Sequence, residues 1–149
     1  MRESHSDLFE HHRVPGHLVC ISTNGFLKRT GAAVMGRGCA LQATVLHPGV
    51  QMLLGAYLRK NGNAPGILVG KKYMLGILPV KHNWWEKASL ELITRSIEWL
   101  RGFAMDTTMV SEVETVHAPR LGCGNGGRNW EREVRPLMLG LPDSVVVHY

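Results

Sequence analysis

The sequence lacks long apolar runs and paired cysteines. No apolar stretch approaches the ~20 residues that a membrane-spanning helix needs, and the polar opening MRESHSDLFEHH has no signal-peptide core. Its three cysteines, Cys20, Cys39 and Cys123, form no C-x-x-C pair, which argues against a disulfide framework and against a thiolate zinc site. We therefore expect a cytoplasmic protein that does not contact a membrane.

Linker-like segments are missing as well, since there is no Ser/Gly-rich tract, charge block or internal repeat. The 149 residues therefore predict one domain, 1–149, and we expect a monomer. The eight histidines include the pair His11-His12, but no H-E-x-x-H spacing occurs, so the sequence predicts neither a metal site nor a cofactor.

Acidic residues are outnumbered, with 12 Asp and Glu against 17 Lys and Arg, giving a formal charge of +5. A basic surface favours an anionic partner such as a nucleotide or nucleic acid.

Short apolar runs alternate with helical patterns along the chain. Strands are predicted at 17–23, in a hairpin over 66–79 that turns at 70–72, at 115–119 and at 144–149. Helices are predicted after Gly38, from Pro48 to about Lys60, from a Ser89 cap to a stop at Gly102, and around Pro136. This alternation predicts an α/β layer structure with a mostly parallel central sheet.

Two glycine-rich loops follow predicted strands. The segment RLGCGNGGRNW, residues 120–130, contains G-x-G-x-x-G, and such a loop presents backbone N–H groups that bind phosphates. A Rossmann fingerprint requires this loop in the first βα unit, whereas here it lies within the last thirty residues. The other loop lies earlier in the chain and is TNGFLKRTGAAVMGRG, residues 23–38. Together the two loops suggest one ligand held between them.

Four segments resemble the macrodomains, which are ADP-ribose-binding modules. They are SDLF at 6–9, ISTN with MGRGCALQ at 21–24 and 35–42, LPVKHNWWEKASLELI at 78–93 and APRLGCGNGGRNWEREVRPLM at 118–138. The last two are similar to the branch of the terminal ADP-ribose glycohydrolase and the DarG-type DNA ADP-ribosyl glycohydrolases. The resemblance implies a three-layer α/β/α fold with a mixed, mostly parallel sheet.

The resemblance also implies site residues. Asp7 would bind the adenine amino group, Leu8 would supply a backbone contact and Asn24 would hold the distal ribose. The diphosphate and distal ribose would lie against two sets of residues: Gly36, Arg37 and Gly38 in one loop, and Gly122, Cys123, Gly124, Asn125, Gly126 and Gly127 in the other. Lys81 would be the catalytic residue.

Lysine chemistry suits the cleavage of a glycosidic bond. A neutral amine can attack the oxocarbenium-like C1″ of ribose and form a covalent adduct that water later resolves. A neighbouring cation would favour the neutral amine, and Arg37, Lys28 and His82 are candidates. The sequence departs from the animal enzyme at Gly126, where that enzyme carries an aspartate, and at Ile21, where many macrodomains carry asparagine.

Three functions remain open from the sequence. The first is an ADP-ribosyl glycohydrolase acting on ADP-ribosylated thymidine in single-stranded DNA, where Trp84 or Trp85 would stack on a base or else pack under the next helix. The second is a non-catalytic ADP-ribose reader. The third is a hydrolase of modified protein or of a small ADP-ribose derivative.

Overall fold

A computed structural model of the chain describes residues 1–106 and 112–149. The central feature is a six-stranded sheet in the order β1-β6-β5-β2-β4-β3. Its strands are β1 (Arg2–Ser4), β2 (His17–Asn24), β3 (Gly66–Val69), β4 (Met74–Lys81), β5 (Thr115–Pro119) and β6 (Val145–His148). All neighbouring pairs are parallel except β3 with β4, so the sheet is mixed and mostly parallel, as predicted.

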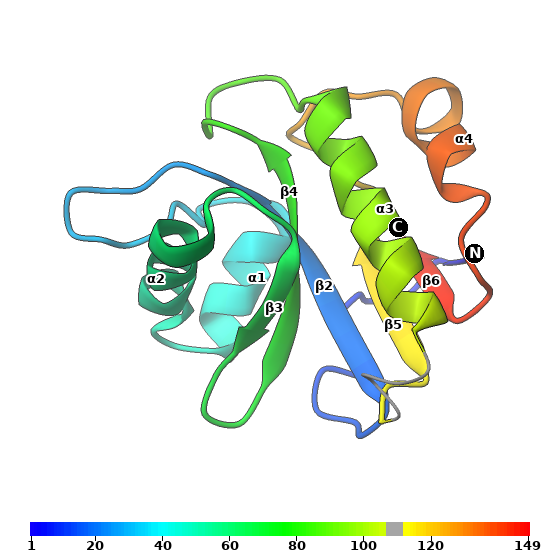
Figure 1. Ribbon diagram of the computed structural model, residues 1–149, viewed down its shortest axis with the longest axis horizontal. Helices are drawn as coiled ribbons and strands as arrows, with labels where there is room; N and C mark the ends of the chain where they lie inside the picture. The colour runs from blue at the N-terminus through cyan, green and yellow to red at the C-terminus, as the bar shows by residue number, and fades with distance from the viewer. Residues whose placement is uncertain (107–111) are drawn as a thin grey trace.

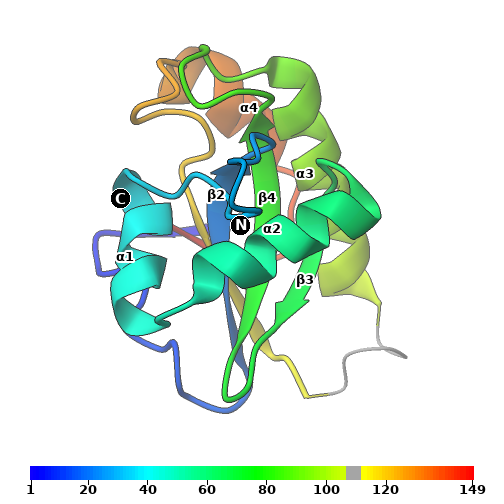
Figure 2. The ribbon, with the colours of Figure 1, turned by 90° about the vertical axis from the view of Figure 1, so that its left-hand side faces the viewer.

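Helices cover both faces of this sheet (Figures 1 and 2). On one face lie α1 (Gly38–Leu46) and α2 (Val50–Asn61), and on the other lie α3 (Leu90–Met105) and α4 (Arg135–Met138), which continues the π-helical turn η1 (Trp130–Val134). Each face has its own apolar core, so the three-layer α/β/α prediction is confirmed. None of the helices in the described residues is long and apolar enough to cross a membrane.

Most predicted elements form where their signals lie. Ser89 caps α3 by accepting a hydrogen bond from the N–H of Leu92 at 3.3 Å, and the final strand is buried along its whole length. The hairpin of β3 and β4 forms around the predicted turn.

Two features differ from the predictions. Helix α3 does not stop at Gly102 but runs to Met105, because Phe103 and Ala104 pack against the core and outweigh the low helix propensity of glycine. Strand β1 was not predicted, since its residues are polar and it pairs only with β6 at the edge of the sheet. Its pairing places the segment after Ser4 beside the carboxyl end of β6.

Candidate functional site

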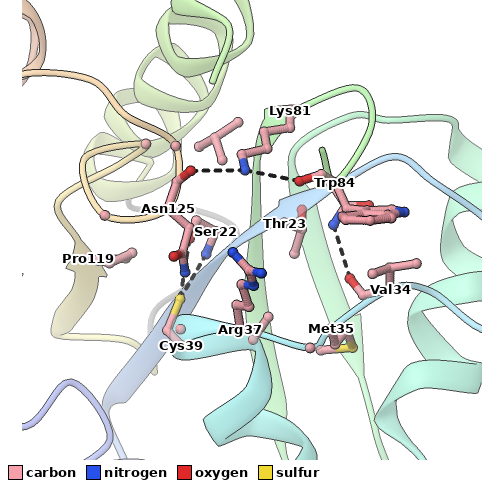
Figure 3. Close-up of a pocket in the computed structure, with 18 of the residues that line it drawn as sticks. Ser22, Thr23, Val34, Met35, Arg37, Cys39, Lys81, Trp84, Pro119 and Asn125 are labelled. Atoms are coloured by element: carbon pink, nitrogen blue, oxygen red, sulfur yellow. Dashed lines mark hydrogen bonds between the residues drawn. The ribbon is translucent and has the colours of Figure 1, made fainter. Parts of the chain in front are cut away.

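The two glycine-rich loops meet over one cavity at the carboxyl ends of the parallel strands. We call residues 25–37, between β2 and α1, the first loop, and residues 120–129, between β5 and η1, the glycine loop. The cavity between them holds about 330 Å³ (Figure 3). Ligands of open α/β sheets bind where neighbouring strand ends diverge, and this cavity lies at such a place.

The first loop is braced by Asn24 at the end of β2. Its amide donates to the carbonyl of Val34 at 3.1 Å and accepts from the N–H of Phe26 at 3.0 Å. These contacts leave one N–H and one lone pair of the amide for a ligand. The loop ends at the N-terminus of α1, where Arg37 provides no side-chain cap and no acidic residue lies in the first turn. Uncapped N–H groups and the positive end of the helix dipole favour an anion here.

The glycine loop presents free backbone donors to the same cavity. Its own turns are closed by the N–H of Gly127, which donates to the Gly124 carbonyl at 3.2 Å, and by that of Arg128, which donates to the Gly122 carbonyl at 2.9 Å. Within the described part of the chain, the N–H groups of Gly124, Asn125 and Gly126 have no protein acceptor. Successive free N–H groups of this kind form a nest for phosphate oxygens.

Lys81 lies at the end of β4 between the two loops. Its carbonyl accepts from the N–H of Gly25 at 3.1 Å and from the amide of Asn63 at 2.9 Å, which fixes the backbone of the residue. Its Nζ donates to the carbonyls of Trp84 and Asn125, each at 3.2 Å (Figure 3). The amine is therefore held above the cavity by one contact from each side.

The cavity wall carries positive charge and lacks acids. Arg37, Lys81 and Arg120 line it, and no Asp or Glu is present among the described lining residues. Arg37 points into the cavity from the start of α1 (Figure 3), whereas Lys28 and His82, the other cation candidates, do not line it. A pair of catalytic carboxylates, the usual device of glycosidases, is therefore missing from this wall.

The cysteines do not supply an alternative nucleophile. Cys39 lines the cavity beside Ser22, whose hydroxyl lies 3.3 Å from its Sγ, but burial raises the pKa of the Cys39 thiol. Burial also raises the pKa of Cys20, and it raises that of Cys123 to about 11. Protonated thiols are poor nucleophiles, which leaves Lys81 as the candidate.

The cavity collects most of the predicted site residues. It is lined by Asn24, Gly36, Arg37, Gly38, Lys81, Gly122, Gly124, Asn125 and Gly126. The thiol of Cys123 instead contacts the carbonyl of Leu121 at 3.3 Å, and Gly127 lies at an exposed turn with φ of 72°. Neither residue lines the cavity.

Asp7 and Leu8 also lie outside the lining. They follow β1, and the Asp7 carboxylate accepts from the N–H of Phe9 at 3.0 Å while Leu8 is buried in the core beneath α1 and α2. The segment is nevertheless at the same edge of the sheet, because it follows the carboxyl end of a parallel strand.

Sequence reasoning missed several polar residues of the wall, among them Arg120 and Thr23. Arg120 lines the cavity and stacks over the rings of Tyr149 at 4.1 Å and Trp130 at 4.9 Å. Its Nη2 lies 3.7 Å from the Glu3 carboxylate, while its Nε is buried and has no hydrogen-bond partner among the described residues. Thr23 contributes a buried Oγ1 that also lacks a partner within the described residues. Arg120 is the first residue of the glycine loop, so its charge beside the loop glycines was the available signal.

The structure gives a physical reason for glycine at position 126. A Cβ there would overlap the carbonyl oxygen of Gly122 and lie 2.8 Å from the Cβ of Ala88. The carbonyl of Gly126 in turn accepts from the N–H of Ala88 at 2.9 Å, so the loop cannot easily move away. An aspartate therefore does not fit at this position in the present loop conformation.

Aromatic side chains flank the cavity beside Lys81. Trp84 lines it and is 50% exposed, while Trp85 is 59% exposed. The two rings meet edge to face at 5.5 Å, and Phe26 meets Trp85 in the same way at 5.5 Å. The alternative that these tryptophans pack under the next helix is therefore wrong.

Solved structures resemble this chain over 99% of its length. The macrodomain of Mycobacterium tuberculosis DarG matches with a TM-score of 0.70 and 21% identity, over 95% of that chain. Thermosipho africanus DarTG in complex with ADP-ribose matches with a TM-score of 0.67 and 19% identity, over 41% of that chain. The macrodomain of Thermus aquaticus DarG matches with a TM-score of 0.65 and 18% identity, over 96% of that chain. No family model and no curated protein matches the sequence. The likeness confirms the macrodomain fold that the sequence motifs predicted.

Proposed function

We propose that this chain, which has the macrodomain fold, binds ADP-ribose and removes it from a modified macromolecule. The observation that carries the proposal is the position of Lys81 Nζ, which the Trp84 and Asn125 carbonyls hold above the cavity. Three cationic side chains and no acid occur among the described residues that line this cavity. Binding is supported by the Thermosipho africanus DarTG structure, a similar chain that is in complex with ADP-ribose.

The geometry suits an ADP-ribose with its diphosphate between the loops. The unpaired N–H groups of the glycine loop and the N-terminus of α1 would bind phosphate oxygens, and Arg37 and Arg120 would balance their charge. Asn24, at the end of β2, would contact the distal ribose, and Asp7 and Leu8 would reach the adenine at the β1 side.

Lys81 would act as the nucleophile. A neutral amine has two N–H groups, which match the two carbonyls at 3.2 Å and leave the lone pair directed elsewhere. Attack on C1″ forms a C–N bond and breaks the glycosidic bond, and the amine proton passes to the leaving nitrogen. Water then displaces the lysine to give free ADP-ribose.

The aromatic group beside Lys81 favours a nucleobase as the leaving group. Trp84 and Trp85 expose their rings next to the cavity, and a base stacked on an aromatic ring gains about 1–3 kcal/mol. We therefore propose ADP-ribosylated thymidine in single-stranded DNA as the substrate.

A second function is favoured by one observation. Gly126 leaves the glycine loop without the acid that resolves the adduct in the animal enzyme, which fits a reader that binds ADP-ribose without turnover.

The experiment follows the mass of a single-stranded oligonucleotide carrying ADP-ribosylated thymidine. The wild type should release the unmodified oligonucleotide, Lys81→Ala should not, and Lys71→Ala, at the far end of the sheet, should match the wild type. An intact oligonucleotide in all three samples, with ADP-ribose binding retained, would favour the reader. Full turnover by Lys81→Ala would refute the lysine mechanism.

A further inference from the structure

Four histidines from four separate segments meet on the α1/α2 face of the sheet. They are His11 in the segment between β1 and β2, His17 on β2, His117 on β5 and His148 on β6. His17 Nδ1 lies 2.8 Å from His117 Nε2, and His117 Nδ1 lies 2.8 Å from His148 Nε2. The ring of His11 lies parallel to those of His17 and His117, with centroids 4.5 and 5.3 Å away.

The contacts of His148 with Ser6, at one end of this row of histidines, indicate which ring nitrogens carry hydrogen. His148 Nδ1 lies 3.1 Å from the Ser6 hydroxyl oxygen and 3.2 Å from the Ser6 carbonyl oxygen. The carbonyl can only accept, so the tautomer with the hydrogen on Nδ1 satisfies both contacts. In neutral His148 the Nε2 must then accept from His117 Nδ1–H. This leaves the lone pair of His117 Nε2 directed toward His17.

Three ring nitrogens lie close together, and a metal ion would replace the proton that His17 Nδ1 donates to His117 Nε2. Each of His11, His17 and His117 offers a ring nitrogen, and these atoms all lie within 4.8 Å of one another. His11 Nδ1 is buried and has no hydrogen-bond partner in the described residues. Nitrogen ligands about 2.0–2.1 Å from a tetrahedral zinc ion lie about 3.3 Å apart, so metal binding requires side-chain rotations in which the His11 ring turns out of its parallel stack.

We propose that His11, His17 and His117 bind one divalent transition-metal ion, of which Zn²⁺ is the type, and that His148 orients His117 from behind. Imidazole nitrogen suits Zn²⁺, Cu²⁺ and Ni²⁺, whereas Mg²⁺ and Ca²⁺ prefer the oxygen ligands that this cluster lacks. A hydrogen bond to the second nitrogen of a ligating histidine is the usual outer support of such sites.

The position of His117 agrees with this role. Only 3% of its surface is exposed, so solvent has little access to its ring nitrogens.

The site has a structural consequence. His11 belongs to the segment that carries Asp7 and Leu8, whereas His17 and His117 belong to adjacent strands of the sheet. A metal ion would tie that segment to β2 and β5. No local pattern predicts the cluster, because His117 lies 100 residues beyond His17 and the three histidines match no metal motif.

The test titrates the tag-free, EDTA-treated chain with Co²⁺ and then displaces it with Zn²⁺. We expect a saturable single equivalent with the visible d–d band of tetrahedral Co²⁺, lost when Zn²⁺ is added. His11→Ala changes a half-buried side chain in a turn and should weaken Zn²⁺ binding about tenfold or more. His5→Ala, which removes an exposed histidine, should bind like the wild type.

Circular dichroism in EDTA checks that each variant is folded. Equal Zn²⁺ affinity of the wild type and folded His11→Ala would overturn the proposal, as would the absence of saturable Co²⁺ binding to the wild type.

Discussion

Two alanine substitutions in the glycine loop should separate packing from ligand binding. A Cβ at Gly126 would overlap the Gly122 carbonyl and lie 2.8 Å from the Cβ of Ala88, whereas a Cβ at Gly124 would have nothing within 4 Å. Neither position has a positive φ, so backbone strain does not contribute at either. The two variants differ only in what the added methyl group meets.

The expected magnitudes follow from this difference. Overpacking lowers the free energy of unfolding by about 1–3 kcal/mol. Replacing glycine by alanine raises it by about 0.4–1 kcal/mol, because alanine reduces the conformational entropy of the unfolded chain. Gly126→Ala should therefore lower the free energy of unfolding by roughly 1–2 kcal/mol, while Gly124→Ala should leave it unchanged or raise it slightly. Both glycines line the cavity, so both variants should bind ADP-ribose less tightly, and Gly124→Ala should do so, by about tenfold, without losing stability.

Urea unfolding measures the first quantity and calorimetry with ADP-ribose the second. The m-values should stay the same, because neither change alters the surface exposed on unfolding. If Gly126→Ala is as stable as the wild type, the close packing against Ala88 does not govern this loop. If Gly124→Ala loses as much stability as Gly126→Ala, the added methyl group does not lie in open space and the packing explanation is refuted.

Three further predictions concern the cavity wall and the core. Arg120→Lys should weaken ADP-ribose binding despite keeping the charge, because the planar contacts with the two aromatic rings are lost; calorimetry against the wild type checks this. Trp84→Ala should weaken binding of modified single-stranded DNA about 5- to 150-fold but leave the affinity for free ADP-ribose nearly unchanged, as measured by fluorescence anisotropy and calorimetry. Burial, followed by the nearby cationic side chains, lowers the pKa of His47. The unfolded chain therefore takes up this proton at a higher pH than the folded chain, and the free energy of unfolding should fall as the pH drops below about 6.5. Urea unfolding between pH 5 and 7 should show a flatter dependence for His47→Phe.

Local signals predicted most of the fold. The hairpin of β3 and β4, the Ser89 cap and the two loops each depend on neighbouring residues, and each forms as expected. Strand β1 depends instead on pairing with β6 at the other end of the chain, with Arg2 opposite Val146. A three-residue polar strand carries no periodicity, so only the assembled sheet could reveal it.

The site divides in the same way. The loop glycines were expected from local glycine-rich patterns and Lys81 from the resemblance of its segment to a known family, and most of these residues line one cavity. Arg120 had only its charge beside the glycine-rich sequence as a signal, and Thr23 had none, since its importance comes from a buried Oγ1 that has no hydrogen-bond partner among the described residues. That property depends on every neighbouring element and cannot be seen in a local pattern.

The contacts of Lys81 also determine which substitutions test its role. Its Nζ joins the carbonyl of Trp84, on the proposed base side, to that of Asn125, on the phosphate side. Lys81→Ala removes a nucleophile and leaves both carbonyls without this donor, so lost turnover alone could reflect a displaced loop. Lys81→Arg keeps N–H donors but is always protonated and cannot attack C1″. We expect Lys81→Arg to bind modified oligonucleotide within about threefold of the wild type, a difference of about 0.7 kcal/mol, and to release no ADP-ribose. Measurable turnover by Lys81→Arg would mean that Lys81 positions the substrate and that another group, such as ordered water, performs the attack.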